Sequence, residues 1–315
     1  MRRRLKIGIC IVILLIIALP VGIKQLVGEE SRSFQVVKLE DTVYKEVSFQ
    51  NPSQNIKLGG MLFIPDGDGP FPAAVIIQGS GASRRDRNWN LTLAQYLQTN
   101  GVVILIPDKR GCDQSEGNWQ TASFEDLATD TLAAISYIKN QNDVTISSIG
   151  VIGMSQGGWI APIVVDNSKD ISFLVSFSGA AVTTHEQLLY EVNYNLRQLG
   201  FLPGISNLIA FPSIFVLTEI SQRELWDAIG NFDPIPYWER ITTRCLVQLG
   251  REDTNVPAEE SEVRLRSLNK SNIDVKVYEG SGHGLEDPVE VGDKYIRDDV
   301  LLDILNFINT PSKLQ

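Results

Sequence analysis

The pattern of apolar and polar positions changes once along the chain, and the change separates two kinds of strand. Segments 42–49 and 56–64 alternate apolar and polar residues, as antiparallel strands with one face in water do. After the turn at Pro65-Asp66-Gly67 the apolar runs become continuous, which predicts parallel strands buried on both faces by helices. These runs are 73–77, 102–106, 149–152, 173–177, 245–249 and 275–278.

Helical spacing predicts the elements that cover the sheet. Leu127, Leu132 and Ile138 recur at this spacing in 124–139, and Ser123 with Asp126 resembles a capping box at its start. A last helix is expected at about 293–308. The fold class is therefore α/β: a mostly parallel twisted sheet with helices on both faces and antiparallel strands at its N-terminal side.

Segment 182–241 shows no clear strand and has helical stretches rich in apolar residues. We interpret it as a helical insertion between two sheet strands and call it the lid. Some of its large apolar residues are expected to line a ligand pocket, and most to pack between helices. They are Leu188, Tyr190, Tyr194, Leu199, Phe201, Phe211, Phe215, Leu225 and Trp226.

Residues 1–28 have the pattern of a targeting segment, with a basic stub at 1–6 and an apolar run at 7–23. The segment is a signal peptide or a membrane anchor; a buried core helix is the third alternative. Pro20 spoils both small-residue cleavage sites, 18–20 and 20–22, which favours an uncleaved anchor. The positive-inside rule then places residues 36–315, the expected folded domain, outside the cytoplasm at the cell membrane; secretion is the alternative.

Composition narrows the class of protein further. The 315 residues are 43% hydrophobic, enough for one large domain with a substantial core. The formal charge of −10 includes five bases in the first 24 residues, which leaves 23 bases against 38 acids in the rest. Such a surface repels phosphate backbones, so no nucleic-acid partner is expected. Beyond the apolar run only Cys112 and Cys245 remain, and we expect both to be free thiols.

The first candidate for chemistry is Ser155, in Gly153-Met154-Ser155-Gln156-Gly157. This G-x-S-x-G follows the run at 149–152 and precedes a helical stretch at 159–165, and a strand-to-helix turn is where the motif exposes a nucleophilic serine. The alternative is a glycine-rich turn that serves packing alone.

A serine nucleophile needs a base within hydrogen-bond reach, and the chain has two histidines. His283 follows the run at 275–278, at the carboxyl end of a strand, where active sites of open α/β sheets assemble. His185 lies at the start of the lid, where a surface or packing role is expected. His283 is therefore the candidate general base.

Asp253 follows the run at 245–249 and could accept the second imidazole proton. Glu252 is the rival acid, and a helix-capping role near Pro257 is the alternative for Asp253. The order Ser155, Asp253, His283 is the order of α/β hydrolases.

From about residue 56 to 307 the chain resembles the α/β-hydrolase superfamily, in particular bacterial esterases related to dienelactone hydrolase and serine aminopeptidase-like hydrolases. The matching stretches are Leu58-Gly59-Gly60-Met61-Leu62 with Pro65, Gln78-Gly79-Ser80-Gly81 with Arg85-Asp86-Arg87, Asp108-Lys109-Arg110-Gly111, Gly153 to Gly157, Asp233-Pro234-Ile235-Pro236, Asp253-Thr254-Asn255-Val256-Pro257 and Gly282-His283-Gly284.

The resemblance implies an oxyanion hole made by the backbone amides of Ser80 and Gln156. Family members usually have histidine where this chain has Gln78, a departure that leaves the hole possible because its donors are amides. The resemblance gives four further residues a structural role in loops near the site. They are Arg85, Asp86, Asp108 and Arg110.

These residues predict a serine hydrolase that cleaves small-molecule carboxylic esters with small or medium acyl chains through an acyl-enzyme. A peptidase, amidase or acyltransferase with the same triad, and a non-catalytic ligand sensor, are the alternatives. No cluster with metal-ligand spacing occurs, and no G-x-G-x-x-G follows the second parallel strand, so neither a metal nor a dinucleotide cofactor is expected.

Overall fold

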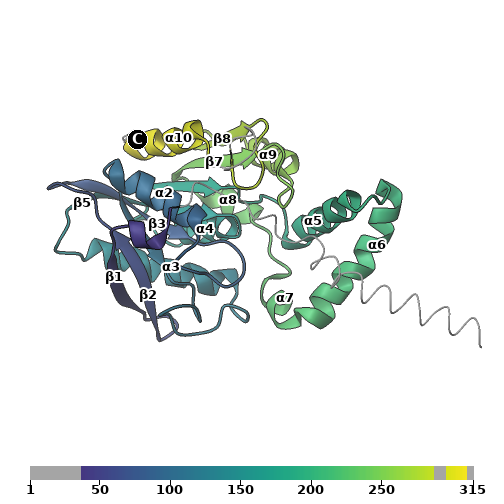
Figure 1. Ribbon diagram of the computed structural model, residues 1–315, viewed down its shortest axis with the longest axis horizontal. Helices are drawn as coiled ribbons and strands as arrows, with labels where there is room; N and C mark the ends of the chain where they lie inside the picture. The colour runs from purple at the N-terminus through teal and green to yellow at the C-terminus, as the bar shows by residue number, and fades with distance from the viewer. Residues whose placement is uncertain (1–36, 287–295, 311–315) are drawn as a thin grey trace, which may run out of the picture.

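The computed structural model describes residues 37–286 and 296–310, and these form one eight-stranded sheet flanked by helices (Figure 1). The strand order is β1-β2-β4-β3-β5-β6-β7-β8. As the alternating patterns predict, β2 is antiparallel to both β1 and β4, whereas all other pairs are parallel. The strands are β1 (Lys45–Asn51), β2 (Ile56–Phe63), β3 (Phe71–Ile77), β4 (Val103–Pro107), β5 (Ile146–Met154), β6 (Phe173–Phe177), β7 (Arg244–Gly250) and β8 (Ile273–Tyr278).

Helices cover both faces of the sheet, which explains the continuous apolar strands. Along β3, Val75 belongs to the core under α3, α4, α8 and α9, whereas Ala74 and Ile76 belong to the core under α2 and α10. The helices of the first face are α3 (Phe124–Lys139), α4 (Gly157–Asp166), α8 (Ile235–Arg240) and α9 (Ala258–Ser267); those of the second are α2 (Asn88–Thr99) and α10 (Asp298–Asn309).

The predicted boundary of the last helix is wrong at its start. Helix α10 begins at Asp298, and Ile296 instead forms an isolated antiparallel bridge with Glu286. The apolar spacing that suggested an earlier start arises because Ile296 is buried in the same core as Val300 and Ile304. Residues 293–295 and the predicted N-terminal targeting segment lie outside the described residues.

The insertion between β6 and β7 is helical, as predicted. It consists of α5 (Thr184–Gln198), α6 (Pro203–Val216), the π-helical turn η2 (Leu217–Ser221), α7 (Arg223–Ile229) and α8. The first four project from the body at the right of Figure 1. Helix α8 packs against α4 and α9 and buries Trp238, so it belongs to the body.

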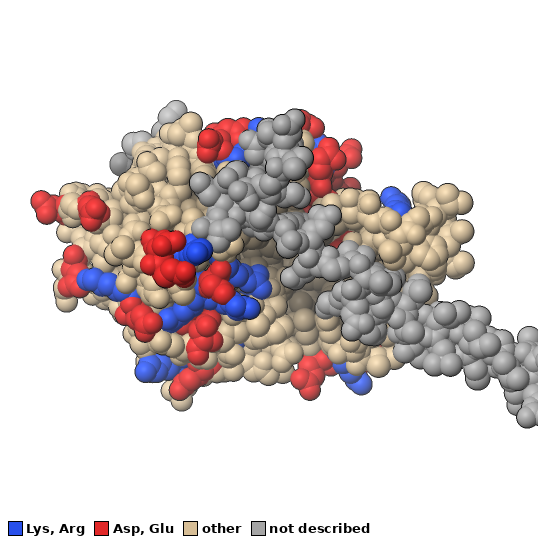
Figure 2. All heavy atoms as spheres, in the orientation of Figure 1, with Lys and Arg blue, Asp and Glu red and all other residues tan. Residues whose placement is uncertain are grey.

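Three of the large apolar lid residues do not pack between helices as expected. Leu199, Phe211 and Phe215 are exposed, and the buried positions of α6 are Ser206, Ala210 and Ser213. Small residues allow α5 and α6 to approach closely, and the large side chains of α6 therefore face outward. The lid surface at the right of Figure 2 is accordingly mostly uncharged.

The capping box of α3 provides a test of this local structure. Ser123 accepts a hydrogen bond from the Asp126 amide and Asp126 accepts one from the Ser123 amide, so Ser123→Ala should lower the free energy of unfolding by about 1 kcal/mol. Urea denaturation measures this, with Ser136→Ala, at an exposed position of the same helix, as the matched control. Equal stabilities of the two variants would contradict the cap's contribution.

Candidate active site

Ser155 lies in a tight turn between β5 and α4, where its φ is +53°. This left-handed conformation is disfavoured for a serine and is held by the surrounding backbone. A Cβ on Gly153 would lie 2.3 Å from the Gly157 oxygen, and one on Gly157 would lie 2.2 Å from the Ile77 oxygen. Only glycine fits at either position, so the two glycines are required for the turn that presents the Ser155 hydroxyl.

The structure brings Ser155, His283 and Asp253 together although they come from three separate loops. The His283 Nε2 lies 3.0 Å from the Ser155 Oγ, and its Nδ1 lies 2.8 Å from the Asp253 Oδ2. Both are hydrogen-bond distances, and they form one continuous chain from carboxylate to hydroxyl. His283 is 12% exposed and the Asp253 side chain is fully buried.

Asp253, and not Glu252, is the acid that meets the histidine. The Asp253 Oδ1 accepts hydrogen bonds from the amides of Asn255 (2.8 Å) and Val256 (2.9 Å), which leaves Oδ2 for the imidazole. Glu252 is exposed. The alternative role of Asp253 as the cap of α9 is not seen, since that helix has no side-chain cap.

Trp89 is a site residue that sequence reasoning missed. Its ring lies 5.6 Å from the His283 ring, centroid to centroid, and packs edge-on against Phe177 at 5.1 Å. Helix α2 carries Trp89 to the site from a part of the chain that contains no recognisable motif. The indole therefore limits the orientations open to the imidazole.

The loop after β3 runs directly alongside Ser155. A Cβ on Gly79 would lie 3.4 Å from the Ser155 Cβ. Among the described residues the amides of Ser80 and Gln156 have no hydrogen-bond acceptor, so both donors are available to a ligand. Gln78, which departs from the family pattern, donates to the Pro107 oxygen (2.7 Å) and accepts from Asn90 (3.0 Å), so it ties this loop to β4 and α2.

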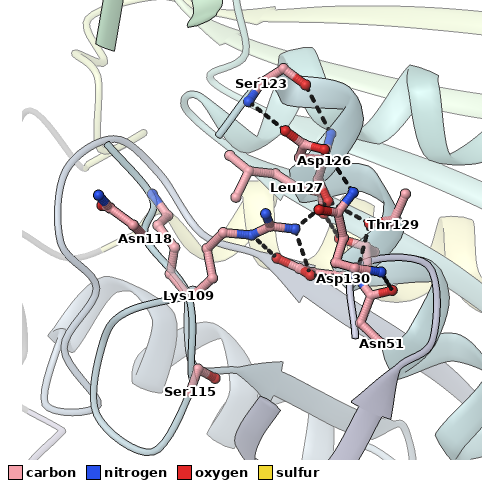
Figure 3. A network of polar contacts seen from close by, with 12 residues as sticks. Asn51, Lys109, Ser115, Asn118, Ser123, Asp126, Leu127, Thr129 and Asp130 are labelled. Carbon is pink, nitrogen blue, oxygen red and sulfur yellow. Dashed lines mark hydrogen bonds and ion pairs between the residues drawn. The ribbon is translucent and has the colours of Figure 1, made fainter. Parts of the chain in front are cut away.

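The four charged residues to which the resemblance gave a structural role all form ion pairs. Arg85 pairs with the buried Asp108 through two hydrogen bonds of 2.9 and 2.8 Å. Arg110 pairs with Asp130 of α3 at 2.7 and 2.9 Å, in the network drawn in Figure 3. Asp86 pairs with its exposed neighbour Arg84. All four predicted loop residues thus have structural partners.

Lid helix α5 contacts the loop that carries the acid. The Tyr190 hydroxyl donates to the backbone carbonyl oxygen of Asp253 (2.7 Å), and the Gln187 side chain donates to the backbone carbonyl oxygen of Asn255 (2.7 Å). Glu191, half-buried beside them, was not singled out from the sequence; burial raises its pKa, opposed by a hydrogen bond from Gln187.

His185 stays within the lid, as expected. Its Nδ1 lies 2.5 Å from the Gly230 oxygen and its ring packs edge-on against Trp226.

The described residues contain no group of three His, Cys, Asp or Glu side chains that could hold a metal ion. Cys112 and Cys245 are free and buried, and burial raises the pKa of the Cys245 thiol. The polar groups that converge at this site include the hydroxyl, the imidazole, the carboxylate and the two amides. In this arrangement the imidazole can accept the Ser155 proton, and the two amides can stabilise a negatively charged oxygen beside it.

The sheet topology and the turn at Ser155 define an α/β hydrolase, the class that the sequence predicted. Within that class the chain belongs to the family described as BAAT / acyl-CoA thioester hydrolase C terminal, which matches residues 132–290. A second family, X-Pro dipeptidyl-peptidase (S15 family), matches residues 55–200.

The chain is similar in sequence to curated proteins and in fold to solved structures. Esterase EstD of Thermotoga maritima is 26% identical over 74% of this chain and 60% of its own length. The mouse peroxisomal succinyl-coenzyme A thioesterase is 23% identical over 75% of this chain and 54% of its own. The chain thus spans little more than half the length of these curated relatives. The solved structure of DcsB in complex with its substrate analogue shares the fold, with a TM-score of 0.62 at 18% identity, over 84% of this chain and 98% of that one.

The stability that Glu186 gives to the start of α5 should depend on pH. Hydrogen bonds from Arg264 lower the pKa of Glu186 from 4.5 to about 2, and Glu186 also completes the capping box with Thr183. Because the folded-state pKa is depressed, this stabilisation is present above about pH 4.5 and is lost as the pH falls towards 2. Glu186→Gln should therefore show a smaller loss of urea stability than the parent between pH 5 and pH 3.

Arg264→Met should also reduce the loss of urea stability between pH 5 and pH 3, because it removes the partner that lowers the Glu186 pKa. An unchanged slope in both variants would contradict the assignment.

Proposed function

We propose that this protein is a serine hydrolase that cleaves carboxylic esters with small or medium acyl chains through an acyl-enzyme intermediate. The observation that carries the proposal is the chain of hydrogen bonds from Asp253 through His283 to Ser155, of 2.8 and 3.0 Å. In this arrangement the hydroxyl is the nucleophile, the imidazole the general base and the carboxylate its orienting partner.

In the acylation step the Ser155 Oγ attacks the ester carbonyl carbon while its proton passes to the His283 Nε2. The carbonyl electron pair moves to oxygen, and the amides of Ser80 and Gln156 stabilise this oxyanion. Each donor of this kind typically contributes on the order of 100- to 1000-fold in rate. The buried Asp253 carboxylate stabilises the imidazolium through Nδ1, and the imidazolium then protonates the leaving alcohol as the tetrahedral intermediate collapses.

In the deacylation step a water molecule replaces the alcohol. His283 takes its proton as the oxygen attacks the acyl carbon, and the same amides stabilise the second oxyanion. Collapse returns the proton to the Ser155 Oγ and releases the carboxylic acid. None of these steps calls on a group beyond the side chains and amides already described.

Thioester cleavage is the second candidate, because the matching family and the mouse relative are both described as thioester hydrolases. The same nucleophile and oxyanion donors serve either substrate, and only the leaving group differs. The match to a peptidase family over residues 55–200 supports amide cleavage less directly. Acyl transfer would use the same acyl-enzyme with an alcohol in place of water, and a ligand sensor would bind without turnover.

Substitution of the proposed triad should abolish turnover by the full chain. Ser155→Ala and His283→Gln are each expected to lower kcat by a factor on the order of 10⁴ or more, because these residues act as a unit. The measurement uses p-nitrophenyl esters of two to twelve carbons, with acyl-CoA thioesters and p-nitroanilides in parallel.

His185→Gln is the matched control for His283→Gln, since it removes the other histidine of the chain without touching Ser155. Its kcat should stay within a few-fold of the parent. Ester turnover retained by Ser155→Ala would overturn the mechanism. A preference for the thioester with Ser155 dependence intact would select the second candidate.

We propose that residues 1–28 hold the hydrolase domain at the outer face of the cell membrane as an uncleaved anchor. The described part of the chain has one helical segment apolar and long enough to cross a membrane, Pro203–Ser221 of the lid, and this is weak evidence of a span. Its exposed apolar side chains, Leu208, Phe211 and Phe215, could contact a lipid bilayer next to the domain.

The anchor proposal predicts where the protein is found after cell breakage. The full chain should sediment with membranes and resist a high-salt wash, because an apolar segment is held by the hydrophobic effect and not by charge. A chain without residues 1–28 should lose this sedimentation. A full chain that remains in the supernatant, or that an impermeant amine reagent labels only in broken cells, would contradict the anchor or its orientation.

A further inference from the structure

Lys109 is a buried amine that the proposed mechanism does not use. It is the second residue after β4 and is 8% exposed, yet among the described residues its Nζ forms no ion pair with a carboxylate. Its Nζ donates instead to three oxygens: the carbonyls of Gly79 and Gly81, the latter at 2.9 Å, and the Gln156 side chain at 3.4 Å. These acceptors belong to the two segments whose amides form the proposed oxyanion hole.

The planarity of the peptide bond links this contact to the site. The Gly79 carbonyl and the Ser80 N–H belong to one trans peptide unit, so they point in opposite directions. Holding the carbonyl oxygen towards Lys109 therefore directs the Ser80 N–H away from Lys109. An amine N–H donated to that carbonyl also polarises the peptide and strengthens its N–H as a donor. Gly81, with a φ of +76°, gives the loop the turn that brings a second carbonyl to the same amine.

Contacts of the Lys109 backbone and of its two neighbours in sequence hold this residue in place. Its amide donates to the buried Ser83 hydroxyl (3.0 Å). On one flank Asp108 pairs with Arg85, and on the other Arg110 pairs with Asp130, which Asn51 of β1 also contacts at 2.7 Å (Figure 3). The amine is consequently presented to the loop from a rigid support.

A structural purpose alone does not explain a lysine here. Burial, followed by the nearby charge of Arg87, lowers the pKa of Lys109 to about 7, so the charged form is disfavoured by its surroundings. A methionine would fill the same space without that penalty. Groups held in such unfavourable environments are concentrated at functional sites.

We propose that Lys109 is a positioning residue for the oxyanion hole, whose amine orients the Gly79–Ser80 peptide unit so that the Ser80 N–H meets the developing negative charge. The inference rests on the proposed hydrolase function. Because the buried Lys109 amine acts through the Ser80 amide, its removal is expected to affect the transition state and to leave ground-state binding unchanged.

The test compares Lys109→Met with the parent full chain on the best p-nitrophenyl ester. We expect kcat to fall about 10- to 100-fold with KM within about threefold, because an oxyanion donor is misdirected and not deleted. Endpoint labelling with a fluorophosphonate counts folded active sites and corrects kcat for any loss of folding. An alkyl boronic acid, which forms a tetrahedral anion on the serine, should bind the variant more weakly by the same factor as kcat. Lys139→Met, on the surface of α3, is the matched control and should match the parent.

The effect of Lys109→Met in a Ser80→Pro variant distinguishes positioning of the Ser80 amide from a general disturbance of the site. Ser80→Pro lacks the amide N–H, so adding Lys109→Met to it should lower kcat by less than about threefold. If Lys109→Met gives no labelled protein, Lys109→Gln, which is one atom shorter and uncharged, takes its place with an expected loss of about tenfold.

Three outcomes would overturn the inference: kcat within twofold of the parent, a loss confined to KM, or a full additional loss in the Ser80→Pro background. Failure of the hydrolase function itself is distinct, because the parent would then be inactive or indifferent to Ser155→Ala.

Discussion

The close approach of three backbone segments at the turn after β5 is the constraint on which the site depends. Gly153 and Gly157 let this turn pass against its own helix and against the end of β3, and Ser155 is left with a positive φ between them. The strain in that residue is supported by a sheet whose central strands are buried in the halves that lead to the turn. Because β3, β6, β7 and β8 run parallel to β5, the loops at their carboxyl ends converge on the same edge. The core that stabilises the sheet thus also determines which side chains can reach the hydroxyl.

The architecture and the proposed triad could be predicted because both depend on local signals. Strand pattern, the capping box at Ser123 and the placement of Ser155, His283 and Asp253 each need only a few neighbouring residues to be read. The sequence favoured Asp253 and left Glu252 as its rival, and the structure explains the preference, since the amides of Asn255 and Val256 fix the Asp253 carboxylate towards the imidazole.

Other features could not be predicted, because they depend on contacts between distant segments. Trp89 reaches His283 from a helix without a motif, and Glu191 meets Asn255 only once the lid has folded back over the acid loop. The outward direction of Phe211 and Phe215 follows from small residues on the opposite side of α6, and hydropathy alone does not assign a direction. Lys109 is part of a recognisable stretch, yet its buried position beneath a loop 30 residues earlier is a property of the fold.

The hydrogen bonds from Tyr190 and Gln187 divide the lid into two parts with different freedom to evolve. Helix α5 shares its contacts with the loop of Asp253, so a change in α5 is transmitted to the acid. Helix α6 makes no such bond among the described residues and packs on α5 and η2, whereas Leu225, Ala228 and Ile229 of α7 contribute to the core of the body. Mutations can therefore accumulate in α6 with less effect on the position of the acid than mutations in α5 would have.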